Sequence, residues 1–102
     1  MIFEGFDDVY DESARLAILR ILAEQVDYRM NIGMVDDLLI QREAINRGRG
    51  YVRNQVAWLR DQARAVLTRE EGGTVFVILT EAGADHVMRR HVLEGVKRQG
   101  PR

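Results

Sequence analysis

The sequence predicts one mostly helical α+β domain, with a core of three helices, a two-stranded β-hairpin and a last helix. Two observations lead to this fold class: apolar residues recur at helical spacing in four stretches, and two β-rich runs flank the pair Gly72-Gly73. The chain has 102 residues, of which 46% are apolar, and one proline. This composition supplies a core for one domain and excludes a wholly disordered or collagen-like chain.

The first helix is expected over residues 11–25, because the apolar residues from Ala14 to Leu22 follow the i, i+3, i+4, i+7, i+8 spacing of one helical face. Before it, residues 1–10 form an apolar N-terminal arm that contains Ile2, Phe3, Phe6 and Val9. Such an arm is too apolar to be left in water, so we expect it to pack on the domain or on a second subunit.

Two further helices follow a short extended piece at residues 28–30. Asn31 is a good N-cap for a helix over 32–45, and residues 46–50 interrupt the helical pattern. Val52, Val56 and Leu59 then resume an apolar stripe with arginines between them, which predicts a third helix over 48–63. The start of this helix is open between positions 48 and 51, because glycine leaves such a boundary soft.

A hairpin and a last helix complete the order. The runs 65–70 and 74–79 are rich in strand-forming residues and are joined by the two glycines. Thr80 is the expected cap of the last helix, whose stripe is predicted to be Ala84, Val87, Met88 and His91. Residues 93–102 are expected to form a flexible tail, which leaves 11–92 as the folded domain.

This order of elements resembles the winged helix-turn-helix, in which three helices bury their stripes on one another and a hairpin, the wing, closes one side. The string Leu79-Thr80-Glu81-Ala82-Gly83 is similar to the start of the final helix in many bacterial winged-helix regulators. Together with residues 15–24, 28–31, 57–59 and 95–98, it resembles small ArsR-like winged-helix proteins of Mu-like prophages. The resemblance covers residues 11–90 and implies a DNA-binding fold in a phage or bacterial setting.

Two features depart from the usual winged-helix pattern. A serine or threonine commonly caps the recognition helix, whereas here that position is Gly48, which weakens the first turn. The hairpin tip, Glu70-Glu71, is acidic where DNA-binding wings are commonly basic. We therefore expect the tip to be held away from DNA or to contact a protein.

Charge is unevenly distributed along the chain, although the net charge is only −1. Residues 41–69 carry seven arginines and no lysine against two acidic residues, and arginine suits bidentate contacts to phosphate and guanine. If the third helix lies in a major groove, the predicted DNA contacts are the outward side chains of this segment. They are Arg47, Arg49, Arg53, Asn54, Arg60, Arg64 and Arg69. The structural alternative is a solvated helix face with scattered ion pairs.

Other kinds of site have little support in the sequence. The absence of cysteine excludes disulfides, zinc fingers and thiolate chemistry. His86 and His91 are five residues apart and do not share a helical face, and Ser13 has no histidine near it in the sequence. We expect no metal, no cofactor and no enzymatic activity. Trp58 is expected to cover the core against the hairpin.

The expected function is therefore a prophage or bacterial transcriptional regulator that binds double-stranded DNA as a homodimer. The predicted dimer contact consists of Ile2, Phe3, Phe6, Val9, Val87, Met88 and Val92. The alternative is a winged helix that docks a phage or host protein in a replication, transposition or assembly complex. The N-terminus is acidic, which predicts no signal peptide, and the longest apolar run, residues 75–79, is too short to span a membrane. We therefore expect a cytoplasmic location.

Overall fold

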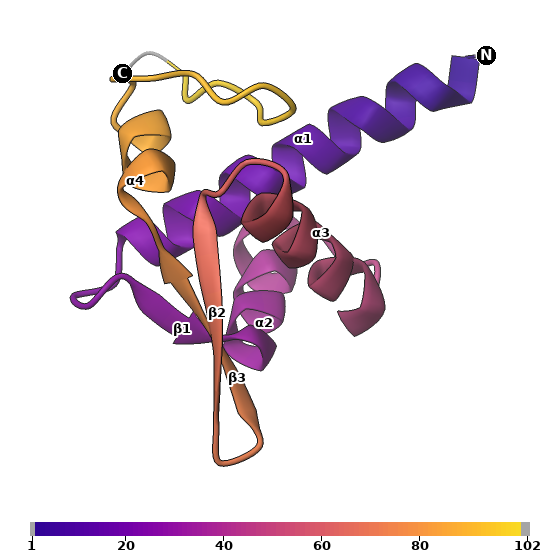
Figure 1. The fold of residues 1–102 in the computed structure, drawn as a ribbon. Helices are drawn as coiled ribbons and strands as arrows, with labels where there is room; N and C mark the ends of the chain where they lie inside the picture. The colour runs from indigo at the N-terminus through magenta and orange to yellow at the C-terminus, as the bar shows by residue number, and fades with distance from the viewer. Residues whose placement is uncertain (1, 101–102) are drawn as a thin grey trace.

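The computed structural model describes the backbone of residues 2–100 and the side chains of residues 8–100. Within this part of the chain, four α-helices and three β-strands form an α+β arrangement, as the sequence predicts (Figure 1). In chain order the elements are α1 (Ile2–Ala23), β1 (Arg29–Asn31), α2 (Ile32–Glu43), α3 (Arg49–Asp61), β2 (Val66–Glu71), β3 (Thr74–Leu79) and α4 (Glu81–Val87).

The first helix, α1, is longer than expected at its start. It runs from Ile2 without interruption, so the backbone of the predicted arm belongs to the helix, and its N-terminal half projects beyond the rest of the molecule (Figure 1). The second half carries the buried face, where Ile18 and Leu22 are fully inside. After the helix ends at Ala23, the Gln25 side chain donates to the carbonyl of Ile21 at 3.1 Å, which satisfies an acceptor of the last turn.

The three strands form an antiparallel sheet in the order β1-β3-β2. The predicted hairpin is confirmed: Val66 pairs with Leu79, and Glu71 pairs with Thr74 next to the turn. Both turn glycines have positive φ, which glycine adopts without strain. The extended piece after α1 is the third strand, because β1 pairs with residues 76–78 of β3.

Two capping predictions are confirmed by hydrogen bonds. Asn31 accepts a bond from the N–H of Met34 at 2.8 Å at the start of α2, and Thr80 accepts one from the N–H of Gly83 at 3.2 Å at the start of α4. At the start of α3, in contrast, Gly48 makes no side-chain capping bond. Other contacts must therefore fix the first turn of α3.

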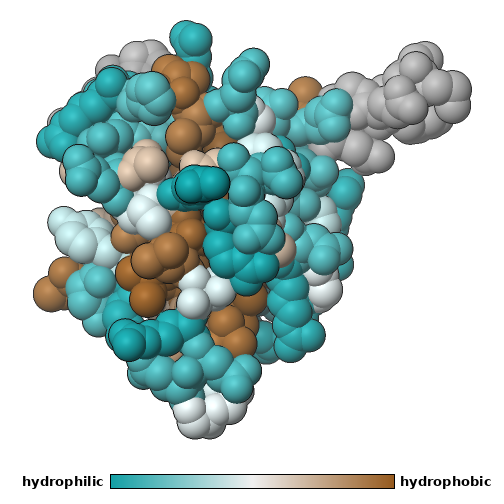
Figure 2. All heavy atoms as spheres, in the orientation of Figure 1, coloured by the Kyte–Doolittle hydropathy of each residue, from teal (hydrophilic) through white to brown (hydrophobic). Residues whose placement is uncertain are grey.

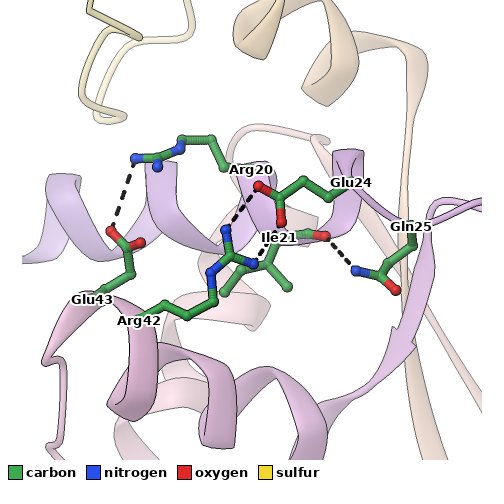
Figure 3. Close-up of polar contacts among 6 residues, drawn as sticks. All are labelled: Arg20, Ile21, Glu24, Gln25, Arg42 and Glu43. Atoms are coloured by element: carbon green, nitrogen blue, oxygen red, sulfur yellow. Dashed lines mark hydrogen bonds and ion pairs between the residues drawn. The ribbon is translucent and has the colours of Figure 1, made fainter.

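The core lies where α1, α2 and α3 meet the inner face of the sheet. Fully buried members come from each of these elements: Ile18, Leu19, Leu22, Val35, Leu39, Val52, Leu59, Val66 and Val77. On the outside, two ion pairs join α2 to the last turn of α1 and to Glu24, the residue that follows α1 (Figure 3). Arg42 pairs with Glu24 at 2.6 Å, and Arg20 approaches Glu43 at 3.9 Å. Hydrogen bonding from Arg42 lowers the pKa of Glu24.

The predicted stripe of the last helix is partly wrong. Helix α4 ends at Val87, so Met88 and His91 follow it and are exposed, whereas His86 is buried. The ring of His86 holds the chain that follows: Nδ1 accepts from the N–H of Leu93 at 3.0 Å, and Nε2 donates to the carbonyl of Lys97 at 2.8 Å. The burial of His86 is explained by its hydrogen bonds to these two backbone groups, which helical periodicity could not predict.

The segment after α4 has no helix or strand up to residue 100, yet its middle packs on the core. Val96 is buried, and the N–H of Lys97 donates to the carbonyl of Glu12 in α1. Gly95 lies against the ring of Trp58, where an added Cβ would overlap the indole. Residues 93–97 of the expected tail thus pack on the domain, because Val96 is buried and hydrogen bonds to Glu12 and His86 anchor the segment.

Trp58 is partly buried, and contacts from two other parts of the chain surround its ring. Its ring is covered by Gly95 on one side, and the guanidinium of Arg15 lies 3.8 Å from the ring centroid. Arg15 also donates to the carbonyl of Gly95 and to the buried Gln55 of α3, both at 2.8 Å. Trp58 therefore joins α3 to α1 and to the C-terminal segment, and it packs against the core as predicted.

Candidate nucleic-acid interface

A groove of about 290 Å³ lies between α3 and the hairpin. Apolar residues of α2, α3 and β3 line it, namely Ile32, Val56, Ala57 and Val75. Its polar lining consists of Arg53 and Arg60 from α3 and Thr68, Arg69 and Glu70 from β2. Figure 2 shows apolar side chains along the middle of this face of the molecule, with hydrophilic ones beside them. The groove thus combines apolar surface with three cations.

Helical periodicity explains why α3 presents cations here. The stripe of Val52, Val56 and Leu59 is buried in the core, as predicted. Arg53 and Asn54 are exposed. Among residues 8–100, whose side chains the structure describes, no acidic side chain forms an ion pair with Arg53. Arg53 is therefore the arginine of this helix whose guanidinium is most available to a ligand.

Arg60 is engaged by the protein itself. Its Nε and Nη2 donate to the two carboxylate oxygens of Asp61 at 2.8 and 3.0 Å, and its Nη1 donates to the hydroxyl of Thr68 at 3.0 Å. This bidentate pair raises the pKa of Arg60 and lowers that of Asp61. Because Thr68 belongs to β2, Arg60 fixes the separation of α3 and the hairpin across the groove.

Arg49, the first residue of α3, is also paired. Its guanidinium lies 3.9 Å from the carboxylate of Asp36 and 3.8 Å from that of Asp37, both in α2. Gly33 of α2 leaves the space for it, since a Cβ there would lie 2.9 Å from Nη1 of Arg49. These contacts link the uncapped first turn of α3 to α2.

Arg47 lies on another side of α3, next to α1. Its guanidinium is 3.8 Å from the centroid of the Tyr10 ring and 5.5 Å from that of Tyr51. The Tyr51 hydroxyl donates to Asp11 at 2.5 Å, and burial together with this bond raises the pKa of Tyr51. Arg47 thus covers an aromatic pair between α1 and α3 and does not line the groove.

The remaining predicted arginines differ in position. Arg69 lines the groove and approaches Glu71 at 3.6 Å, and Glu71 in turn pairs with Arg29 at 3.2 Å. Arg64 is exposed in the connection between α3 and β2, with a positive φ of 54°, and its carbonyl accepts a bond from the Thr80 hydroxyl. One acid of the hairpin tip, Glu71, is therefore balanced by two arginines.

Of the seven predicted DNA contacts, the structure gathers Arg53, Arg60 and Arg69 in one groove, with Asn54 exposed beside Arg53. Three residues that shape this surface were not predicted: Thr68, Asp36 and Asp37. Helical spacing offered a signal for Asp36, because it lies four residues after Ile32 on the buried side of α2. No local signal could have paired Thr68 with Arg60.

The predicted dimer residues whose side chains the structure describes lie on different elements. Val9 is exposed on the projecting half of α1, and Met88 and Val92 are exposed in the segment that follows α4. Val87 is partly buried against the core. The side chains of Ile2, Phe3 and Phe6 lie outside the described residues.

No protein-family model matches the chain, and searches of curated proteins and of solved structures found no match. In the part of the chain that the structure describes, no helix is both long and apolar enough to cross a membrane. Over the same residues, no group of three or more histidine and carboxylate side chains is placed to hold a metal ion.

Proposed function

We propose that this protein is a winged helix-turn-helix DNA-binding protein, in which α3 enters the major groove and the β2–β3 hairpin is the wing. The observation that carries the proposal is the groove where Arg53, Arg60 and Arg69 come together from two elements. The element order α1, β1, α2, α3, β2, β3, α4 supports it, because it is the order expected of this fold.

The residues in and beside the groove have different proposed roles. Arg53 and Asn54 are exposed on α3 and suit bidentate contacts to guanine and adenine, while the small Ala57 allows close approach to a thymine methyl group. Arg69 on β2 is placed to meet a phosphate. Arg60 is a positioning residue, since three of its five N–H groups are already bonded to Asp61 and Thr68.

The wider role that fits such a domain is transcriptional regulation in the cytoplasm of a bacterium, as a prophage or host regulator acting as a homodimer. One domain of this size contacts a short DNA site, and two-fold pairing raises affinity for a symmetric operator. In such a dimer, the projecting half of α1 in one subunit would reach the exposed Met88 and Val92 of the other.

The alternative is a winged helix that docks a phage or host protein. It is favoured by the outward face of the sheet, where Leu67 is 57% exposed and Arg29 lies 4.3 Å from the ring centroid of Phe76. The acidic Glu70 in the groove also disfavours phosphate there. We rank this role second because the arginine-lined groove lies on the helix that this fold uses for DNA.

The deciding experiment is a salt titration of binding to random duplex DNA. The logarithm of the wild-type affinity should fall linearly with the logarithm of salt concentration between about 50 and 200 mM, and Arg69→Ala should flatten that slope by about 0.9 through the loss of one phosphate contact. Arg90→Ala is the matched control, because Arg90 is exposed, pairs with Asp85 and does not line the groove.

Each failure has a distinct meaning. A wild-type protein that binds duplex DNA at no salt concentration would reject the DNA-binding role. If Arg69→Ala and Arg90→Ala reduce salt-dependent binding equally, the DNA-binding role is kept and the groove is rejected as the binding surface.

A further inference from the structure

We propose that Asp36 and Asp37 form an acidic clamp that holds Arg49 away from DNA in the free protein, so that the chain restrains its own affinity. This inference rests on the proposed DNA-binding function. Arg49 changes its partner when DNA binds. In the free protein it pairs with the two acids of α2, and in the complex it pairs with a DNA phosphate at the N-terminus of α3.

The first support is the position of the guanidinium. It lies 3.9 Å from Asp36 and 3.8 Å from Asp37, so both acids of α2 attract the same cation. Gly33, one turn earlier on α2, leaves the surface open where the guanidinium lies. Asp36, Asp37 and Gly33 thus form one binding site on α2 for the guanidinium of Arg49.

The second support is the state of Asp36. Its side chain is 6% exposed, and its Oδ1 is buried without a hydrogen-bond partner among the described residues. A buried carboxylate needs a cation nearby, and the cations around this one belong to α3. A small cavity of about 20 Å³ beside Asp36 is lined by Arg49 and Arg53. The acid therefore competes with an external anion for the arginines of the candidate interface.

The third support is that the contact is weak enough to exchange. Arg49 is 57% exposed, Asp37 is 52% exposed, and the distances exceed those of a charge-assisted hydrogen bond. Pairs of this kind contribute little in water and are screened by salt. A DNA phosphate near the start of α3, where the helix dipole also favours an anion, would compete for Arg49 on equal terms.

Asp37→Asn tests the clamp without disturbing the core, because Asp37 is the exposed acid of the two. We expect binding to random duplex DNA at low salt to tighten by about two- to fivefold, the range that an exposed ion pair supports. The matched control is Asp27→Asn, which removes the same charge from the exposed loop between α1 and β1. It should give a smaller gain.

The double variant Asp37→Asn/Arg49→Ala separates the clamp from a general charge effect. If the clamp acts through Arg49, the gain from Asp37→Asn disappears when Arg49 is alanine. A gain that persists in that background, or one equal to that of Asp27→Asn, would overturn the inference. No gain from Asp37→Asn would overturn it as well.

A second measurement detects the interaction between Asp37 and Arg49 in the absence of DNA. In a double-mutant cycle on urea unfolding, Asp37→Asn and Arg49→Ala should be coupled, each losing its effect in the presence of the other. If the wild type binds no DNA and the cycle shows coupling, the ion pair is supported, but the proposed DNA-binding function and the restraint on DNA affinity are both rejected. If DNA is bound and the cycle shows no coupling, the clamp alone is wrong.

Discussion

Gly83 of α4 lies directly against the backbone of Ala65, and a side-chain carbon on residue 83 would overlap the Ala65 carbonyl oxygen. That same oxygen accepts a hydrogen bond from the N–H of Thr80 at 3.0 Å. The close approach places the start of α4 against the connection that leads from α3 into β2. It also explains why a glycine occupies the first turn of a helix, where alanine would otherwise be preferred.

Gly83→Ala should therefore destabilise the protein, by about 1–3 kcal/mol, because the backbone it would displace is hydrogen-bonded. The check is the free energy of unfolding in urea. Gly50→Ala is the control: residue 50 lies in α3 with open space around it, and alanine there should stabilise the helix by about 0.5–1 kcal/mol. Equal effects of the two substitutions would mean that α4 does not approach Ala65 so closely.

His86→Ala should loosen the segment that follows α4. The substitution leaves the N–H of Leu93 and the carbonyl of Lys97 without their partner, at a cost of about 0.5–1.5 kcal/mol for each of these partly buried hydrogen bonds. Because Gly95 of this segment covers Trp58, tryptophan emission should shift to longer wavelength.

His91→Ala is the matched control, since His91 is exposed, and it should change the stability by less than about 0.5 kcal/mol. Unchanged emission in the His86 variant would show that the segment stays on Trp58 without the imidazole.

The Glu24–Arg42 pair between α1 and α2 should make stability depend on pH. Hydrogen bonding from Arg42 lowers the pKa of Glu24 below its ordinary value of 4.5. A depressed carboxyl pKa contributes stability above the unfolded-state value, and this contribution is lost as the pH falls through the folded-state value. Because both side chains are more than a third exposed, the contribution is small, about 0.2–1 kcal/mol.

Glu24→Gln should remove this part of the acid sensitivity. Unfolding free energies of the two proteins should differ at neutral pH and converge as the pH falls through the lowered folded-state pKa of Glu24, below which the carboxyl is protonated in both states. A constant difference over the whole range would mean that Glu24 acts through packing and not through its charge.

Removal of residues 2–9 tests the proposed homodimer. These residues form the projecting half of α1, so their loss should leave the core intact and convert a dimer to a monomer in sedimentation. Met88→Lys should have the same effect if Met88 lies in the contact, because it is already exposed and a charge there costs nothing in the monomer. A full-length chain that sediments as a monomer at tens of micromolar would reject the dimer.

The sequence by itself determined the features that depend on neighbours along the chain. The caps Asn31 and Thr80, the turn at Gly72 and the buried stripe of α3 follow from local hydrogen bonding and from the 3.6-residue helical period. The fold class follows from their order. The spacing of the apolar residues in 2–10 is also helical, so it indicates the projecting start of α1, although we expected a separate arm there.

Only the tertiary structure decided which cations remain available to a ligand. Arg49 meets Asp36 from another helix, Arg60 meets Thr68 from a strand, and Arg47 meets Tyr10 from α1. The contact of Trp58 with Gly95 and the burial of His86 are of the same kind. Periodicity shows which face of a helix points outward, but ion pairs, aromatic contacts and backbone anchors depend on which distant element arrives at that face, and packing alone determines this.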